Sequence, residues 1–153
     1  MRFSFWPNPT QSFEVMKNLG VHIESTGWDG IWFADHFMPN EGDVQTDFPE
    51  SWTTMTAIAA TVPRIRIGTL VTGNTYRHPT LLANMAATLD QVSGGRLVLG
   101  LGAGWQVNEH EAYGLDFGTV SSRLERLEEA CQIIRGLNTE ETFSFDGKYY
   151  QLK

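Results

Sequence analysis

The sequence predicts an α/β fold built on a parallel sheet, and three observations predict it. Four short apolar runs, typical of strands buried on both faces, occur along the chain. Stretches with the apolar period of a helix separate these runs. The runs begin roughly 30 residues apart, which is the length of one strand-helix unit. Strands that alternate with helices in this way pair in parallel.

The first unit consists of the apolar run 3–6, which Pro7 ends, and a helix. Ser12 is the expected N-cap of this helix, and Gly27 is its expected stop. The apolar face of the helix is formed by Phe13, Met16, Leu19 and Ile23.

The second unit consists of the run 31–34 and a helix that Ser51 is expected to cap and Pro63 to end. Its apolar face is formed by Trp52, Met55, Ile58 and Val62. The third unit begins with the run 65–71. Its helix ends at Gly94-Gly95 and carries Leu82, Met85, Leu89 and Val92.

The fourth unit begins with the run 97–101, and a short helix is expected over 106–113. A longer helix follows over 121–137, with Leu124, Leu127, Cys131 and Ile134 on its apolar face. Cys131 is interpreted as a packing residue rather than a reactive thiol. The segment 142–152 predicts a β-hairpin with a two-residue Asp146-Gly147 turn.

Four strand-helix units form either an open doubly wound sheet or half of a TIM (β/α)8 barrel. Two features favour the half barrel. Each strand is followed by a polar or glycine-rich loop on what would be one rim, and the chain stops directly after the hairpin. A complete barrel typically needs ~250 residues. We therefore expect residues 1–153 to be the N-terminal part of one larger barrel domain.

Composition narrows the classes of function. Hydrophobic residues make up 41% of the chain and charged residues 19%, as in globular proteins. The net charge of −7 argues against nucleic acid and anionic membranes as partners. No signal peptide or membrane-spanning run is found, and the single cysteine excludes an intrachain disulfide, so a cytoplasmic location is expected. Exposed edges on the outer strands favour a homo-oligomer.

Asp35-His36 directly follows the apolar strand that begins at Gly30. Polar residues at the carboxyl ends of barrel strands are where chemistry is placed. His36 is therefore a candidate general acid or base, with Asp35 orienting it. The alternative is a histidine on the rim that hydrogen-bonds only to backbone.

Two further loops are candidates for ligand binding. The loop 69–79 offers hydroxyls, amides and a glycine, although the local sequence alone favours a simple connector. The segment 100–105 resembles a dinucleotide glycine motif but fails it, because Trp105 stands where the third glycine is required. Its glycines would still let the backbone approach a ligand closely.

Asn108-Glu109-His110-Glu111 suggests a metal site through its alternation of carboxylate and imidazole. No matching pair of ligands follows the first strand, so no metal is expected. The preferred interpretation is a solvated short helix.

Taken together, four segments resemble the luciferase-like monooxygenase superfamily, and within it the branch that uses the deazaflavin coenzyme F420. These segments are 30–36, 67–79, 90–96 and 99–105, and the resemblance continues through 143–152. It covers nearly all of this chain but only the first half of a family member.

The resemblance implies a barrel that binds F420, or alternatively FMN, at its carboxyl rim beside a small-molecule substrate. It assigns His36 as catalytic acid or base, and Thr69-Leu70 as a non-proline cis peptide against the ring. The positions that match cofactor contacts are Thr69, Leu70, Thr72, Gly73, Gly104, Trp105 and Asn108. Trp105 departs from the glutamate of some sugar-phosphate dehydrogenases of the group, which argues against their substrate here. A family dimer interface is the second route to a homo-oligomer.

Three hypotheses follow for function. The first is the N-terminal half of an oxidoreductase that moves a hydride between F420 and a small organic substrate. The second is an FMN-dependent monooxygenase of the same superfamily. The third is a non-catalytic half barrel that associates with itself through its strand edges.

Overall fold

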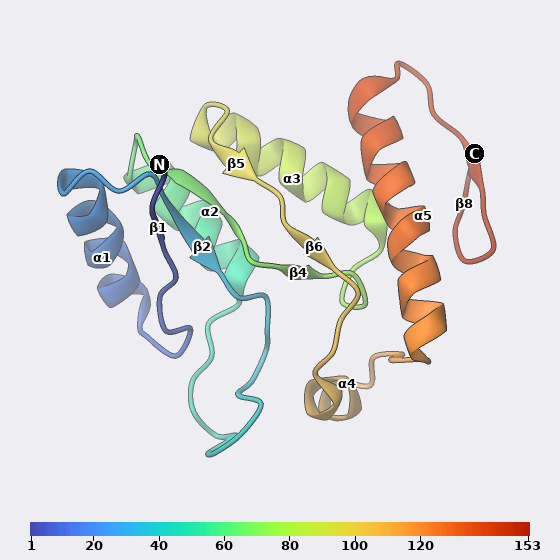
Figure 1. Cartoon of the computed structure of the whole chain (residues 1–153), viewed down its shortest axis with the longest axis horizontal. Coiled ribbons are helices and arrows are strands. Elements are labelled where there is room, and N and C mark those ends of the chain that lie inside the picture. Colours follow the sequence, from blue (N-terminus) through green and yellow to red (C-terminus); the bar gives the residue numbers. More distant parts are fainter. The chain divides into compact units, whose positions relative to one another are not determined.

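A computed structural model describes residues 1–153, and it contains five helices and eight short strands (Figure 1). In chain order they are β1 (Ser4–Phe5), α1 (Phe13–Ser25), β2 (Gly30–Phe33), α2 (Ser51–Thr61), β3 (Arg66–Thr69), β4 (Thr72–Gly73), α3 (Pro79–Ser93), β5 (Leu97–Val98), β6 (Leu101–Gly102), α4 (Val107–Tyr113), α5 (Val120–Thr139), β7 (Phe145–Asp146) and β8 (Gln151–Leu152).

The chain divides into two compact units. The first comprises Met1–Thr72 and Thr88–Gly100, and the second comprises Gly73–Ala87 and Leu101–Lys153. None of the helices combines the length and the apolar character that a membrane crossing requires.

The main sheet, in the first unit, has the order β1-β2-β3-β5, and every neighbouring pair in it is parallel. This confirms the predicted α/β class. Helix α1 packs on α2 and on β2, and α2 packs on β3. The predicted apolar face of α2 is confirmed, because Trp52, Met55, Ile58 and Val62 are all buried.

The helix ends of the first unit confirm two predicted caps and correct a third. The Ser12 hydroxyl accepts a hydrogen bond from the Val15 amide, and Gly27 follows α1 with a φ of 83°. Ser51, however, does not cap α2. The N-cap is Glu50, whose carboxylate accepts from the amides of Trp52 and Thr53. The Ser51 hydroxyl instead donates to the Ala34 carbonyl. A carboxylate satisfies two amides at once and complements the positive helix terminus.

The third and fourth predicted strands are each interrupted. Run 65–71 contains β3, and β4 begins directly after it. Run 97–101 contains β5 and the first residue of β6. The break in the fourth strand falls at Gly100, whose carbonyl accepts from both the Thr69 hydroxyl and the Thr72 amide. Gly100 has no room for a side chain there, since a Cβ would meet the Thr69 carbonyl. Beyond the breaks, β4 pairs with β6 in a two-stranded sheet.

Helix α5 corrects the predicted apolar face. Leu124 and Cys131 are exposed, whereas Ala130, Ile133 and Ile134 are buried. The prediction of Cys131 as a packing residue is therefore wrong. Gly136 lies on the buried face with Ala130 and Ile133, and the Phe143 ring packs closely on it.

The C-terminal hairpin is confirmed, but its predicted turn is wrong. Asp146 pairs with Gln151 in the antiparallel ladder, so the loop contains residues 147–150 rather than Asp146-Gly147. The reason lies on α5. The Glu129 carboxylate accepts hydrogen bonds from the amides of Lys148 (2.8 Å), Tyr149 (3.0 Å) and Tyr150 (3.1 Å). These three bonds stabilise a wider loop than a two-residue turn allows.

Arg96 holds the carboxyl end of α2. Its guanidinium donates to the carbonyls of Ala59 (2.7 Å), Val62 (2.8 Å) and Ile65 (2.8 Å). Two of these belong to the last turn of a helix, where carbonyls lack helical partners and where a cation is favoured. Burial lowers the pKa of Arg96, and the nearby Glu24 acts in the opposite direction.

Replacing Arg96 with methionine should therefore destabilise the protein by about 3 kcal/mol, since several carbonyls lose a charged donor at once. Urea unfolding of the complete protein measures this change. Arg66→Met is the matched control, because Arg66 is exposed and should change stability by less than about 0.5 kcal/mol. Equal unfolding midpoints for the two variants would show that Arg96 has no such role.

Candidate functional site

The carboxyl ends of β2 and β3 lie side by side in the first unit. Phe33 pairs with Thr69, and the Leu70 amide donates to the Phe33 carbonyl at 2.8 Å. Asp35 and His36 follow β2 directly, so they emerge at the edge where Leu70 follows β3. Asp35 is buried and His36 is half-buried. The structure thus brings these predicted residues to one edge of the sheet.

The non-proline cis peptide is present, but it joins Leu70 to Val71 rather than Thr69 to Leu70. The prediction was wrong by one peptide bond. The Leu70 amide is still part of the parallel ladder through its bond to Phe33. The peptide before Leu70 therefore keeps the geometry of a strand, and the chain leaves the ladder at the next bond.

The two predicted threonines of this loop contribute hydroxyls to the protein itself. Thr72 donates to Thr69 at 2.9 Å, and Thr69 donates to the Gly100 carbonyl at 2.9 Å. Both threonines are buried. The side chains exposed at this edge are instead Leu70 (52%) and Val71 (40%). An apolar surface of this kind suits one face of a flat aromatic ring.

The remaining predicted residues, Gly73, Gly104, Trp105 and Asn108, belong to the second unit. Gly73 lies under the Tyr76 ring, and Gly104, with a φ of 85°, lies under Thr75. Trp105 is 59% exposed beside Gly104. Asn108 lies in the first turn of α4, where its side chain accepts from the Glu109 amide. The exposed Trp105 indole is the part of this segment that fits a flat cofactor.

The interpretation of 108–111 as a solvated helix is wrong in part. Glu109 and His110 are almost fully buried. Glu109 accepts from the Tyr76 hydroxyl, and His110 contacts Thr75 at 2.7 Å. Sequence reasoning missed Thr75 and Tyr76 as partners, because only the fold brings them to α4. The structure holds no group of three or more His, Cys, Asp or Glu side chains placed to bind a metal ion.

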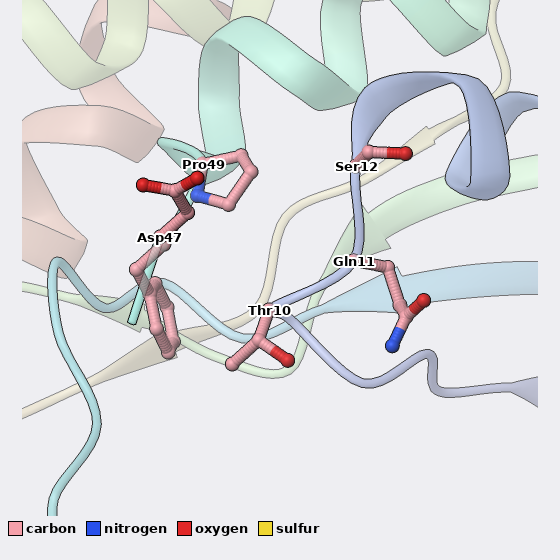
Figure 2. A pocket seen from close by; sticks show the side chains of 6 residues that line it. Thr10, Gln11, Ser12, Asp47 and Pro49 are labelled. Carbon is pink, nitrogen blue, oxygen red and sulfur yellow. The ribbon is translucent and has the colours of Figure 1, made fainter. Parts of the chain in front are cut away.

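A pocket of about 430 Å³ lies between the loops that follow β1 and β2. Its volume is in the range of small-molecule sites. Figure 2 shows Asp47 and Pro49 on one side of it, with Gln11 and Ser12 on the other. The complete lining is Thr10, Gln11, Ser12, Asp47, Phe48 and Pro49. This mixture of carboxylate, amide, hydroxyls and a ring fits a small polar organic molecule.

Tyr150 of the hairpin contacts the segment that follows Gly73, within the second unit. Its hydroxyl is 3.5 Å from the amide nitrogen of Asn74, and its ring meets the edge of His78 at 5.2 Å between centroids. Burial raises the pKa of Tyr150, and the bond from Asn74 partly opposes this rise. The hairpin therefore covers the segment that carries Gly73.

Comparisons with known proteins identify the family of this chain. The sequence profile of the luciferase-like monooxygenase family matches residues 1–153. An F420-dependent glucose-6-phosphate dehydrogenase of Amycolatopsis mediterranei is 36% identical over 140 residues, which are 90% of this chain and 41% of that protein. The corresponding protein of Kineococcus radiotolerans is 36% identical over 138 residues, with 90% and 40% covered. The chain thus spans about two-fifths of these relatives.

Solved structures of similar fold match almost the whole of this chain. An F420-dependent secondary alcohol dehydrogenase in complex with an F420-acetone adduct has a TM-score of 0.89 at 25% identity, covering 99% of this chain and 46% of that one. The monooxygenase RslO1 of Streptomyces bottropensis has a TM-score of 0.84 at 25% identity, covering 99% and 47%. Matches that span nearly all of this chain and just under half of each structure confirm the expected half barrel.

Proposed function

The chain belongs to the luciferase-like monooxygenase family, and from this premise we propose that it is the N-terminal half of an F420-dependent oxidoreductase. The reaction is hydride transfer between the deazaflavin and a small organic substrate. One observation supports it most directly. Because β2 and β3 pair in parallel, His36 follows one strand at the edge where the exposed Leu70 and Val71 follow the other, which supports the proposal.

Two groups of residues are assigned to the cofactor in this proposal. In the first unit, Leu70 and the neighbouring Val71 provide apolar surface for the ring system. In the second unit, the family resemblance assigns Gly73, Gly104, Trp105 and Asn108 to the cofactor. Thr69 and Thr72 hold the loop through buried hydroxyls. When bound, the deazaflavin supplies the hydride chemistry itself.

A ring nitrogen of the His36 imidazole donates a proton to the substrate oxygen or accepts one from it. Asp35, which precedes it and is buried, orients this part of the loop. The Ser51 hydroxyl donates to the Ala34 carbonyl and so fixes the backbone just before Asp35. A proton donor held in this way is the main contribution of the protein to catalysis.

In this proposal the substrate binds next to the pocket that lies between the loops after β1 and β2. Asp47 and Thr10 can bond a hydroxyl, and Phe48 offers an apolar face. Trp105 stands where some sugar-phosphate dehydrogenases carry a glutamate, so an uncharged alcohol or carbonyl compound suits this chain better than their substrates.

Titration of the complete protein with F420 and with FMN tests the cofactor. We expect F420 to bind at least about tenfold more tightly, a difference of about 1.4 kcal/mol. Quenching of tryptophan fluorescence reports both titrations, since Trp105 adjoins the proposed ring site. Tighter binding of FMN would instead support an FMN-dependent monooxygenase of the same superfamily. Binding of neither cofactor would overturn the proposal.

A further inference from the structure

Helix α4 buries two side chains that the proposed chemistry does not use. Glu109 is 0% exposed and His110 is 1% exposed. Buried polar groups of this kind are retained where specific partners satisfy them. Both have partners on the segment Gly73–Tyr76, which lies in the same compact unit.

The bonds of His110 fix its orientation and its tautomer. Its Nδ1 lies 2.6 Å from the Gln106 carbonyl, which can only accept, so Nδ1 carries the hydrogen. In the neutral ring Nε2 then accepts from the Thr75 hydroxyl at 2.7 Å. The ring also meets Phe117 edge-on, with centroids 4.7 Å apart. His110 therefore holds the Thr75 hydroxyl in one position.

Thr75 in turn packs on Gly104. A Cβ at Gly104 would lie 2.6 Å from the Thr75 hydroxyl oxygen, so the two residues are in direct contact. Arg123 donates to the Gly104 carbonyl at 3.2 Å. The backbone at Gly104 is thus held on both sides, by Thr75 and by Arg123.

Glu109 holds Gly73 in a corresponding way, through Tyr76. It accepts from the Tyr76 hydroxyl, and the Tyr76 ring lies on Gly73 so closely that a Cβ there would be 2.6 Å from the ring carbon Cδ2. Two consecutive residues of α4 therefore hold two consecutive side chains. Each of those side chains packs on a glycine predicted to contact the cofactor.

We propose that Glu109 and His110 are positioning residues for the cofactor, which fix the backbone of Gly73 and Gly104 through Tyr76 and Thr75. This inference rests on the proposed function, because the contacts of both glycines with the cofactor are part of that proposal. Neither residue needs to touch the cofactor or the substrate. Their effect is on how well the binding backbone is preorganised.

The Thr75 hydroxyl offers the sharpest test. Thr75→Val keeps the shape of the side chain but removes the bond to His110, whereas Thr75→Ser keeps the hydroxyl. Ile133→Val is the control for stability, since Ile133 is a buried α5 residue and its loss of one methylene lowers stability comparably. In the complete protein, the Kd for F420 should rise about tenfold in Thr75→Val and stay near wild type in the other two variants.

A second measurement needs no cofactor. Amide hydrogen exchange of the peptide 102–106 in the cofactor-free protein should be roughly fivefold faster in Thr75→Val than in Thr75→Ser. If Thr75→Val changes neither the Kd nor this exchange rate beyond Ile133→Val, the role of His110 is overturned. Tyr76→Phe removes the bond to Glu109, and an unchanged Kd in that variant overturns the role of Glu109. If the wild-type protein binds no F420, the proposed function fails instead, and the assignment of Glu109 and His110 to the cofactor fails with it.

Discussion

Replacing His36 with alanine in the complete protein is expected to lower kcat by about 100-fold or more, because a positioned general acid or base contributes at least this much. The Kd for F420 should stay within about twofold of wild type, since the imidazole acts on the reacting proton rather than on the ring system. Steady-state kinetics with a secondary alcohol, together with a fluorescence titration of F420, measures both quantities.

His22→Ala is the matched control. It removes the same side chain from an exposed position in the last turn of α1, so it should leave kcat and Kd unchanged. Unchanged kcat in His36→Ala would remove His36 from the mechanism. A large rise in the Kd with unchanged kcat would make it a binding residue instead.

Gly68→Ala should destabilise the protein by about 3 kcal/mol, the upper range for overpacking a well-packed core. Gly68 pairs with Trp32 on one side and with Val98 on the other. A Cβ would lie 2.6 Å from Trp32 Cζ3 and closer still to the Val98 carbonyl oxygen. The Val98 carbonyl cannot move away without disrupting the pairing of β3 with β5, so relief of this clash would itself cost free energy.

Gly20→Ala is the control for this substitution. Gly20 lies inside α1, and its added Cβ would meet only side-chain ends, those of Val62 at 3.2 Å and Ile58 at 3.5 Å. Helix propensity favours alanine by about 1 kcal/mol, which offsets this contact. Thermal unfolding should therefore separate the two variants by several degrees. Similar melting temperatures would show that the sheet adapts at Gly68.

The parallel order of the sheet could be predicted from the sequence, because buried strands such as 31–34 and 65–71 have a continuous apolar pattern that does not depend on distant residues. Ser12 and Gly27 were predictable for a similar reason, since caps are local interactions. The cap of α2 was not, because Ser51 and Glu50 both have cap chemistry. Only the position of the Ala34 carbonyl, which binds the Ser51 hydroxyl, decides between them.

The candidate site could be predicted only in part. Asp35 and His36 follow a strand, and their position at its carboxyl end needs no tertiary information. The burial of Glu109 and His110 depends on Tyr76 and Thr75, which are 33 and 35 residues away along the chain. The same limitation applies to α5, where Cys131 is exposed while Gly136 is buried under the Phe143 ring. Periodicity within one helix contains no information about such contacts.

The attachment of the hairpin loop to Glu129 has a consequence for ionic strength. Three amides converge on this carboxylate, and Glu125 adds an ion pair with Lys148 at 2.7 Å. Dissolved ions screen attractions of this kind at the surface. Excluded salts such as sulfate instead strengthen apolar burial, which holds Ile133 and Ile134 in place. Added sulfate should therefore weaken the attachment of the hairpin loop and strengthen the apolar core of the same unit.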